Sequence, residues 1–170
     1  RELELKVLLA MKQGTAPSDL WLNVKMLSKV TIDQFYGIEL EEFPVEIARV
    51  SMWLMEHVTN LKFGEAFGMA FPSIPLQHSA VIVCANALTI DWESVVPLKK
   101  LNYILGNPPF SGARMMGRES SQKSELKQVF HDLKGCENLD YVTCWFKKAS
   151  ELLAGTPKEI AFVATNSICQ

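Results

Sequence analysis

The sequence predicts an α/β fold with a doubly wound, mainly parallel sheet, and three observations support this. Apolar, strand-like runs alternate with segments of helical periodicity along the 170 residues. The strand-like runs are continuously apolar rather than alternating, as expected where helices cover both faces of a parallel sheet. Polar side chains follow directly after three of these runs, which is where ligands bind in sheets of this kind.

The expected elements follow from apolar periodicity and from the positions of Gly and Pro. Strands are expected over residues 34–39, 79–88, 102–106 and 158–165. Helices are expected over residues 2–13, 44–60, 124–133 and 139–154. Residues 63–75 are punctuated by Gly and Pro and are expected to form a loop.

Local signals justify the first two helices. Leu5, Leu8 and Leu9 share one face of the first helix, and Gly14 is a stop signal after it. Pro44 suits the first turn of the second helix, and apolar residues recur at helical spacing after it.

Composition is that of a soluble globular protein without an overall signature for binding polyanions. Hydrophobic residues make up 48% of the chain and charged residues 21%, and the net charge is −2. Nucleic acid, if bound, would need a local basic patch or protein outside these residues. Nothing in these residues resembles a signal peptide, and no apolar run approaches the roughly 18 residues of a membrane span. We therefore expect a cytoplasmic protein without a membrane partner.

The four cysteines and three histidines show neither a Cys-x-x-Cys pair nor a spacing typical of a metal site. We therefore expect no metal, and cysteines that are reduced and buried, as in cytoplasmic proteins. The cysteines are Cys84, Cys136, Cys144 and Cys169.

Both ends of the sequence suggest a piece of a longer protein. Residue 1 lies inside a helical pattern, and residue 170 comes just after a strand-like run. We expect residues 1–170 to form part of a single domain that is incomplete at both ends.

Polar residues at the ends of the first two strands suggest a nucleoside site. Glu39 ends the first run, where one carboxylate can accept hydrogen bonds from both hydroxyls of a ribose. It could also be a solvated charge near the start of a helix. Asn86 follows the second run and either offers a donor and an acceptor to a purine edge or forms an Asx-type turn.

The third strand leads into "GNPPF", which combines a carboxamide, two prolines and an aromatic ring. Because proline has no N–H group, this loop presents two acceptors, the side-chain oxygen of Asn107 and the carbonyl of Pro108. Two acceptors can hold both hydrogens of a planar amino group and favour its pyramidal, more nucleophilic form. Phe110 can stack on the ring that carries the amine. The alternative is a proline-terminated strand followed by a core phenylalanine.

These motifs resemble those of amino-group methyltransferases that use S-adenosylmethionine. "GNPPF" is similar to their catalytic motif, "FYGIELEEFPVEIARVSMWLMEH" to their second-strand motif, and "ANALTIDW" to the motif that contacts the cofactor adenine. Together they resemble the DNA adenine-N6 methyltransferases of large single-chain restriction–modification enzymes (types IIG and IIL, MmeI-like), over about residues 37–170. The resemblance implies the Rossmann-like class I methyltransferase fold.

The resemblance also implies a cofactor site for S-adenosylmethionine. Glu39 would hold the ribose, Leu40 would pack on the adenine, and Asn86 would contact the adenine edge, with Ala87 in the same site. The family's glycine-rich loop, of the form Asp-Pro-x-x-Gly-x-Gly, is absent from these 170 residues. We therefore expect this chain alone to bind the cofactor weakly and to be inactive.

For the target base, the resemblance implies that Asn107 and Pro108 bind the adenine amine and that Phe110 stacks on the base after it has flipped out of duplex DNA. The segment "EIAFVATNS" would lie beside this pocket. Arg114 and Arg118 would contact DNA phosphates from a mobile loop, or would belong to a solvated polar loop. Most DNA contact would come from a target-recognition domain that is not in this chain.

Two further functions stay open. The same motif serves enzymes that methylate a glutamine side chain in a protein or N2 of guanine in RNA. The second open possibility is a non-catalytic Rossmann-like module that serves only for interactions.

Overall fold

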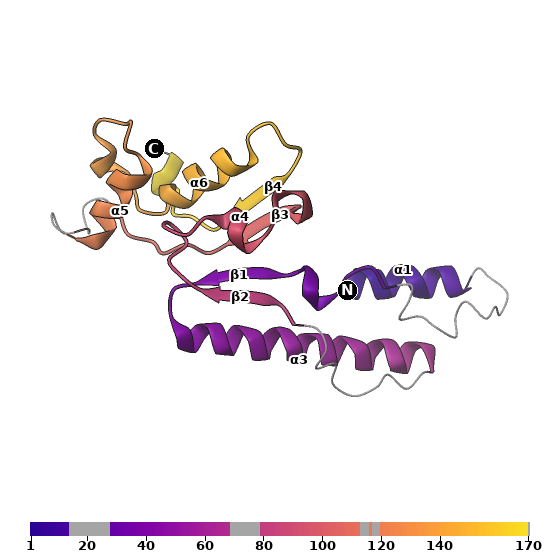
Figure 1. The fold of residues 1–170 in the computed structure, drawn as a ribbon. Coiled ribbons are helices and arrows are strands. Elements are labelled where there is room, and N and C mark those ends of the chain that lie inside the picture. The colour runs from indigo at the N-terminus through magenta and orange to yellow at the C-terminus, as the bar shows by residue number, and fades with distance from the viewer. Residues whose placement is uncertain (14–27, 69–78, 113–115, 117–119, 170) are drawn as a thin grey trace. The chain divides into compact units, whose positions relative to one another are not determined.

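Residues 1–13, 28–68, 79–112, 116 and 120–169 are described by the computed structural model. They divide into two units, Arg1–Ala85 and Asn86–Gln170, and each unit contains one pair of parallel strands (Figure 1).

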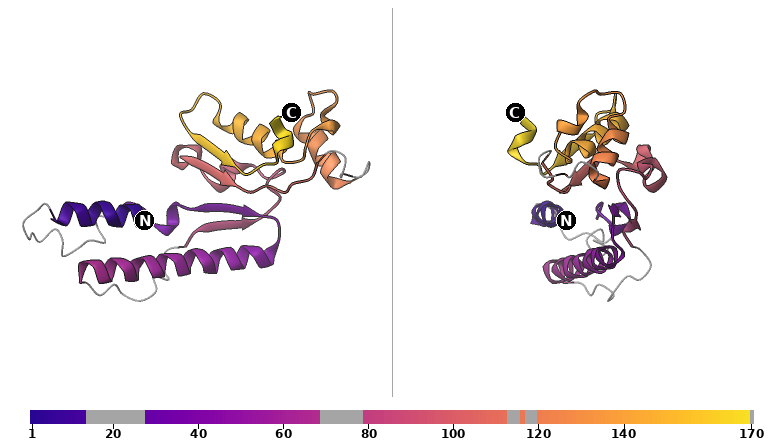
Figure 2. Two further views of the ribbon diagram at one scale, coloured as in Figure 1. Left: turned by 180° about the vertical axis from the view of Figure 1, so that it is seen from behind. Right: turned by 90° about the vertical axis from the view of Figure 1, so that its left-hand side faces the viewer.

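In the first unit a long helix connects the two parallel strands. Its elements are α1 (Glu2–Gln13), the 3-10 helix η2 (Ile32–Gln34), β1 (Tyr36–Glu39), α3 (Glu42–Phe67) and β2 (Val81–Cys84). β1 pairs with β2 so that Glu39 lies opposite Cys84, at the carboxyl ends of both strands. α3 runs alongside this pair (Figures 1 and 2) and packs one face against it. The buried residues of this core are Ile32, Val45, Ala80 and Ile82.

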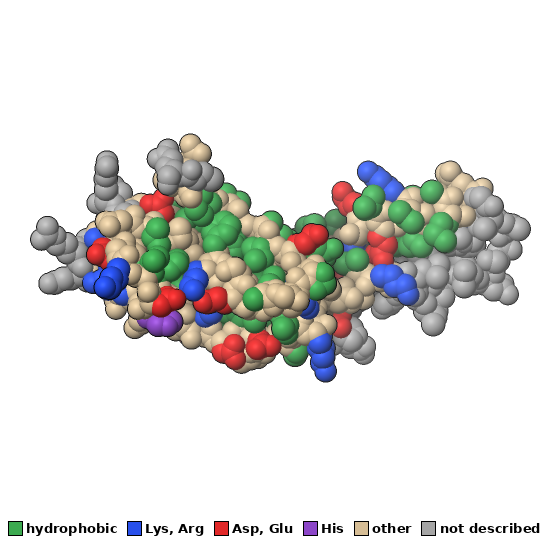
Figure 3. All heavy atoms as spheres, turned by 90° about the horizontal axis from the view of Figure 1, so that it is seen from above, with side chains coloured by type: hydrophobic (Ala, Val, Ile, Leu, Met, Phe, Trp, Pro, Cys, Tyr) green, Lys and Arg blue, Asp and Glu red, His purple; other side chains and the backbone are tan. Residues whose placement is uncertain are grey.

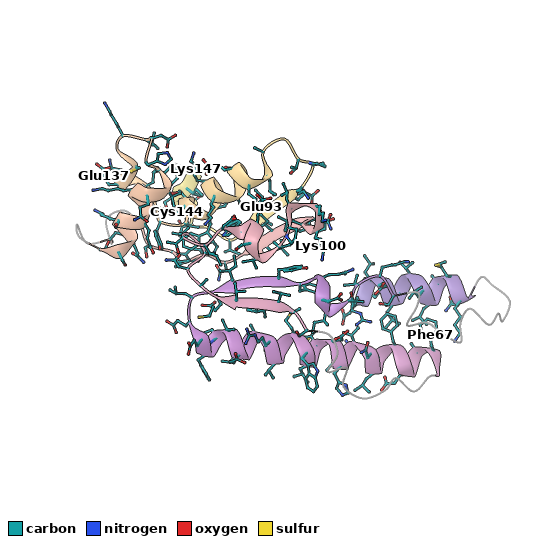
Figure 4. The ribbon with its side chains drawn as sticks, in the orientation of Figure 1. Phe67, Glu93, Lys100, Glu137, Cys144 and Lys147 are labelled. Atoms are coloured by element: carbon teal, nitrogen blue, oxygen red, sulfur yellow. The ribbon has the colours of Figure 1, made fainter. Side chains whose placement is uncertain are left out.

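α3 is longer than the sequence predicts. A loop is expected over residues 63–75, whereas α3 continues to Phe67 and is capped by Gly68, whose φ of 68° is left-handed. Phe63 and Phe67 are buried against Leu8 of α1, at the end of α3 where Figure 4 marks Phe67. Burying two aromatic rings contributes more than the roughly 1 kcal/mol that one glycine inside a helix costs. Tertiary packing therefore overrides the local loop signal.

The second unit contains the other parallel pair and most of the predicted site. Its helices and strands are α4 (Trp92–Val95), β3 (Tyr103–Gly106), α5 (Ser121–Val129), α6 (Thr143–Leu153) and β4 (Glu159–Phe162), with 3-10 helices η3 (Leu98–Lys100), η4 (Cys136–Asn138) and η5 (Asn166–Cys169). β3 pairs with β4 so that Gly106 lies opposite Phe162. α6 packs on this pair through Phe146, whose ring meets that of Phe162 edge-on at 5.1 Å between centroids.

The core of the second unit lies where α5 and α6 meet. Leu126 of α5 and Cys144 of α6 are completely buried there; Figure 4 marks Cys144. The other buried members are Leu88, Met116, Cys136 and Tyr141. These come from the loops on both sides of β3 and from the start of α6, so this core anchors the segments that carry the predicted motifs.

The predicted strands and helices are all present, with shifted ends, and the short helix α4 was not expected. Helix cover on both faces of the strands is not confirmed, since within the described residues Tyr103 and Leu105 of β3 are 66% and 75% exposed. The structure is therefore a mixed α/β fold with small parallel sheets. A complete doubly wound sheet stays a prediction.

The cysteine prediction is only partly correct. Cys136 and Cys144 are buried and free, but Cys84 is free and exposed, because it is the last residue of β2, whose buried residue is Ile82. The side chain of Cys169 lies outside the described residues. In the part of the chain that the structure describes, no three His, Cys, Asp or Glu side chains are grouped so that they could hold a metal ion. None of the described helices has the length and apolar character needed to cross a membrane.

Phe63 and Phe43 lie on the same helix and offer a matched test of the packing between α1 and α3. Phe63 is 1% exposed and Phe43 is 76% exposed. We expect Phe63→Ala to lower the free energy of unfolding by about 3–5 kcal/mol, because it leaves a cavity in the core. Phe43→Ala should change it by less than about 0.5 kcal/mol. Urea denaturation measures both, and equal losses would contradict the assigned packing.

Candidate functional site

Glu39 ends β1 and is held by the backbone that leads into α3. Its Oε1 accepts hydrogen bonds from the N–H groups of Leu40 at 2.8 Å and Glu41 at 3.4 Å. Among the described residues no hydrogen bond is made to Oε2. Leu40 follows with its side chain 63% exposed. The strand end therefore presents one carboxylate oxygen without a hydrogen-bond donor among the described residues, and one largely exposed apolar side chain.

The end of β2 is hydrogen-bonded to the backbone of Glu39 and Leu40. The N–H of Ala85 donates to the carbonyl of Glu39 at 2.8 Å, and the thiol of Cys84 donates to the carbonyl of Leu40 at 3.4 Å. The exposed thiol of Cys84 therefore lies beside the two residues predicted to hold a ribose and an adenine.

Asn86 begins the second unit and forms the Asx-type turn that was one of its two interpretations. Its Oδ1 accepts from the N–H of Leu88 at 2.8 Å, and its Nδ2 donates to Oε1 of Glu125 at 2.5 Å. An amide group has two hydrogens and two lone pairs, so one of each remains. The turn and a contact with a purine edge are therefore compatible, and the adenine contact stays a prediction.

Ala87 lies in this turn, and its carbonyl is fixed by Trp92. The indole N–H of Trp92 donates to the carbonyl of Ala87 at 2.7 Å. Trp92 is the first residue of α4, whose N-cap Asp91 accepts from the N–H of Glu93 at 3.0 Å; Figure 4 marks Glu93 on this helix. The segment "ANALTIDW" is thus a short loop closed by its own tryptophan.

Glu125 links Asn86 to the buried side chain of Tyr141. The hydroxyl of Tyr141 donates a short hydrogen bond to Oε2 of Glu125. The backbone N–H of Tyr141 donates to the carbonyl of Ser111 at 2.9 Å. Burial, followed by the hydrogen bond and charge of Glu125, raises the pKa of Tyr141 above its ordinary value. The hydroxyl therefore stays protonated and continues to donate. Asn86 and Ser111, which belong to two different motifs, are joined through these two residues.

Cys144 lies in the core behind this network. Its burial, followed by the negative charge of Glu125, raises the pKa of the Cys144 thiol to about 12. The thiol is therefore neutral near pH 7, and because the thiolate is the reactive form, Cys144 is expected to be inert.

The third predicted motif follows β3 directly. A Cβ at Gly106, the last residue of β3, would lie 3.1 Å from the ring of Phe162, so any larger residue here would have to push this ring aside. The side chain of Asn107 is exposed and makes no hydrogen bond among the described residues, and Pro108 is buried. Phe110 is 50% exposed, so it is not the core phenylalanine of the alternative interpretation. The predicted acceptor and stacking ring are both accessible.

Asp140 joins the loop after β3 to the segment after β4. Its Oδ2 accepts from the hydroxyl of Thr165 at 3.3 Å and from that of Ser167. A Cβ at Gly112 would lie 3.4 Å from its Oδ1. The "VATNS" segment, expected beside the target pocket, therefore lies next to the loop that follows "NPPF".

Arg114 and Arg118 belong to the residues outside the described ranges, which are grey in Figure 3, so their role stays a prediction.

The structure brings together two sets of predicted residues. Glu39 and Leu40 are adjacent in the first unit. In the second unit, Asn86 is connected to the "NPPF" loop through side chains that sequence reasoning missed. That all three strand ends line one cleft stays a prediction.

The supporting residues that the sequence did not indicate make their hydrogen bonds to residues far away in the sequence, so no local pattern pointed to them. They are Glu125, Asp140 and Tyr141, together with Lys148 of α6, whose ammonium donates to the backbone carbonyls of Ala87, Leu88 and Ile90. Trp92 is different, because it lies within "ANALTIDW" itself, so a local role in closing that loop could have been predicted from the motif.

Comparison with known proteins assigns a family. The family model described as "MmeI, DNA-methyltransferase domain" matches residues 1–170. "DNA methyltransferase A" of Bacillus subtilis (strain 168) is 36% identical over 144 residues, which are 83% of this chain and 16% of that protein. The solved structure of the Type IIL restriction–modification enzyme MmeI in complex with DNA is 40% identical, with a TM-score of 0.86, and the match covers 98% of this chain and 22% of that one. The chain therefore spans between 16% and 22% of the length of these relatives.

Exposure should separate the cysteines in a labelling experiment. Cys84 is exposed, whereas Cys136 and Cys144 are buried. We expect iodoacetamide at pH 8 to alkylate Cys84 well before the other two in the native protein, as followed by peptide mass spectrometry. In urea the three rates should become similar. Native labelling of Cys144 as fast as that of Cys84 would contradict the described core.

Proposed function

Since the chain belongs to the MmeI DNA-methyltransferase domain family, we propose that it transfers a methyl group from S-adenosylmethionine to N6 of adenine in duplex DNA, within a restriction–modification enzyme. The observation that carries this proposal is the loop after β3, where the exposed side chains of Asn107 and Phe110 flank two prolines. The two similar proteins support DNA as the substrate, because one is named a DNA methyltransferase and the other is a restriction–modification enzyme in complex with DNA.

Asn107 and Pro108 would act on the amine of the target base. The side-chain oxygen of Asn107 has no hydrogen-bond donor among the described residues, so it is available to accept one N–H of the amine. The carbonyl of Pro108 would accept the other. Holding both hydrogens localises the nitrogen lone pair and favours the geometry of the transition state. Phe110 would stack on the purine ring and keep it in this orientation.

The amine of a paired adenine is inside the duplex and engaged with its partner base. An enzyme that modifies it must therefore move the base out of the stack into its own pocket. The half-exposed ring of Phe110 supports such a step, because it offers a stacking surface that replaces the neighbouring bases.

The residues at the ends of β1 and β2 fit a nucleoside ligand. S-adenosylmethionine, when bound, supplies the methyl group on a positively charged sulfur. Oε2 of Glu39 can accept hydrogen bonds from the ribose hydroxyls, since Oε1 alone satisfies the neighbouring backbone. Leu40 offers an exposed apolar surface to the adenine. Asn86, with Ala87 beside it, retains one amide hydrogen for the adenine edge.

We also propose that both units are parts of one Rossmann-like class I methyltransferase domain. In each unit a helix lies in the connection between two parallel strands, as in doubly wound sheets. The match to the solved structure, which covers 98% of the chain, supports this. A cytoplasmic location is part of the same proposal, because duplex DNA is the proposed substrate.

Activity should be tested in the full-length enzyme. The family's glycine-rich cofactor loop is absent from these 170 residues, and we expect this chain alone to bind S-adenosylmethionine weakly. Most DNA contact is also proposed to lie outside it, with Arg114 and Arg118 contributing locally.

Asn107→Ala in the full-length enzyme tests the catalytic assignment. Loss of a hydrogen bond that holds the reacting amine should lower the methylation rate by at least about 10²–10³-fold. DNA binding, measured by gel mobility shift, should be unchanged. Methylation is measured by transfer of labelled methyl groups from S-adenosylmethionine to genomic DNA from a strain that lacks the enzyme.

Asn102→Ala is the matched control, because Asn102 is also an exposed asparagine and directly precedes β3. It should retain wild-type methylation. Methylation by Asn107→Ala at the wild-type rate would refute the catalytic role. Detection of N4-methylcytosine in place of N6-methyladenine would refute the choice of base.

Cys84 offers a test of the cofactor site that does not depend on activity. Its thiol donates to the carbonyl of Leu40, beside Glu39, so a nucleoside bound there should cover it. We expect S-adenosylmethionine to slow alkylation of Cys84 in the full-length enzyme, and Glu39→Ala to remove this protection. The same alkylation rate with and without the cofactor would argue against the assigned site.

A further inference from the structure

Lys148, on α6, holds the loop 86–90 through three backbone carbonyls. Its Nζ donates to the carbonyl oxygens of Ala87 at 2.8 Å, Leu88 at 3.0 Å and Ile90 at 2.5 Å. An ammonium group has three hydrogens, so these bonds use its whole donor capacity. Burial lowers the pKa of Lys148, while the charge of Asp91 partly opposes this. The loss of hydration is offset by the three carbonyls rather than by a directly paired carboxylate.

The same loop is fixed from two other directions. The ring of Trp92 lies 5.5 Å from the Lys148 ammonium, and its indole N–H shares the carbonyl of Ala87 with the lysine. Within the loop, the side chain of Asn86 accepts from the N–H of Leu88 at 2.8 Å. The ammonium of Lys148 is therefore the common donor that orients the carbonyls of Ala87, Leu88 and Ile90 toward one point.

We infer that Lys148 is a positioning residue for cofactor binding, which sets the shape of the loop 86–90 before S-adenosylmethionine arrives. The inference rests on the proposed function, in which Asn86 and Ala87 contact the cofactor adenine. Lys148 itself does not touch the cofactor in this scheme. A loop that is already ordered lowers the dissociation constant, because less conformational freedom is lost on binding. The chemical step at Asn107 does not use Lys148, so its loss should affect affinity rather than turnover.

Lys148→Met in the full-length enzyme tests this, since methionine keeps most of the apolar stem and removes all three hydrogen bonds. We expect the Kd for S-adenosylmethionine, measured by calorimetric titration, to rise by about 10-fold or more, as for the loss of preorganisation in a binding loop. KM for S-adenosylmethionine should rise in parallel, and kcat should stay within about twofold of the wild type.

Lys147→Met is the matched control. Lys147 is the neighbouring residue of α6, marked in Figure 4, and pairs with Glu151 at 2.6 Å instead of with the loop. It should leave Kd, KM and kcat unchanged. A Kd that rises equally in both variants would overturn the inference, as would an unchanged Kd in Lys148→Met.

Lys148→Arg carries the test if the methionine variant does not fold. A planar guanidinium keeps the charge but cannot direct three N–H groups at carbonyls around one point. The Kd should again rise in a variant that still unfolds in one cooperative thermal transition, and a wild-type Kd would overturn the inference. Failure of the proposed function is distinguishable, because then the wild-type enzyme would not bind S-adenosylmethionine or Asn107→Ala would still methylate. If the wild-type enzyme binds S-adenosylmethionine and Asn107→Ala is inactive, but the Lys148 variants keep the wild-type Kd, only the present inference is refuted.

Discussion

The hydrogen bonds of Tyr141 are the interaction on which the rest of the second unit depends. Its backbone N–H donates to Ser111, in the loop after "NPPF", and its hydroxyl donates to Glu125, which accepts in turn from Asn86. Because the pKa of Tyr141 is raised by burial and by Glu125, the hydroxyl remains a donor at neutral and mildly alkaline pH. One buried residue thus supports both the loop proposed to hold the target amine and the loop proposed to hold the cofactor adenine. Displacing either loop would break hydrogen bonds in a buried region, where unsatisfied polar groups are costly.

A steric constraint at the end of β3 also helps to fix the position of the loop that follows it. The ring of Phe162 lies close to Gly106 and also packs edge-on against Phe146 of α6, so a larger residue at position 106 would disturb this pair of rings. The chain then leaves the sheet through two prolines, which have fixed φ and no N–H to offer. Pro108 is buried while Asn107 is exposed. The loop is therefore anchored through the ring of a proline, and the polar side chain beside it is free to meet a ligand.

The strands, and the residue types at their ends, were predictable from the sequence because both depend on local composition. Continuous apolar runs form β2 and β3, and the polar residues follow them where expected. The end of α3 was not predictable, because Phe63 stays helical through contact with Leu8, far away in the sequence. The roles of Glu125 and Lys148 were hidden for the same reason. Their partners are 39 and about 60 positions away, and one polar residue on a helix has no periodic signal.

Exposure divides the proposed site into side chains that would touch ligands and side chains that hold them. Leu40, Asn107 and Phe110 are exposed, whereas Tyr141 is buried in a hydrogen-bonded network. The supporting hydrogen bonds are therefore made during folding and not when a ligand arrives. Electrostatic and hydrogen-bonding groups act best on a transition state when they are already oriented, because no free energy is then spent on reorganising them. In the second unit, Lys148 orders the loop proposed to hold the cofactor adenine, and Tyr141 holds the carbonyl of Ser111 after the loop proposed to hold the target amine.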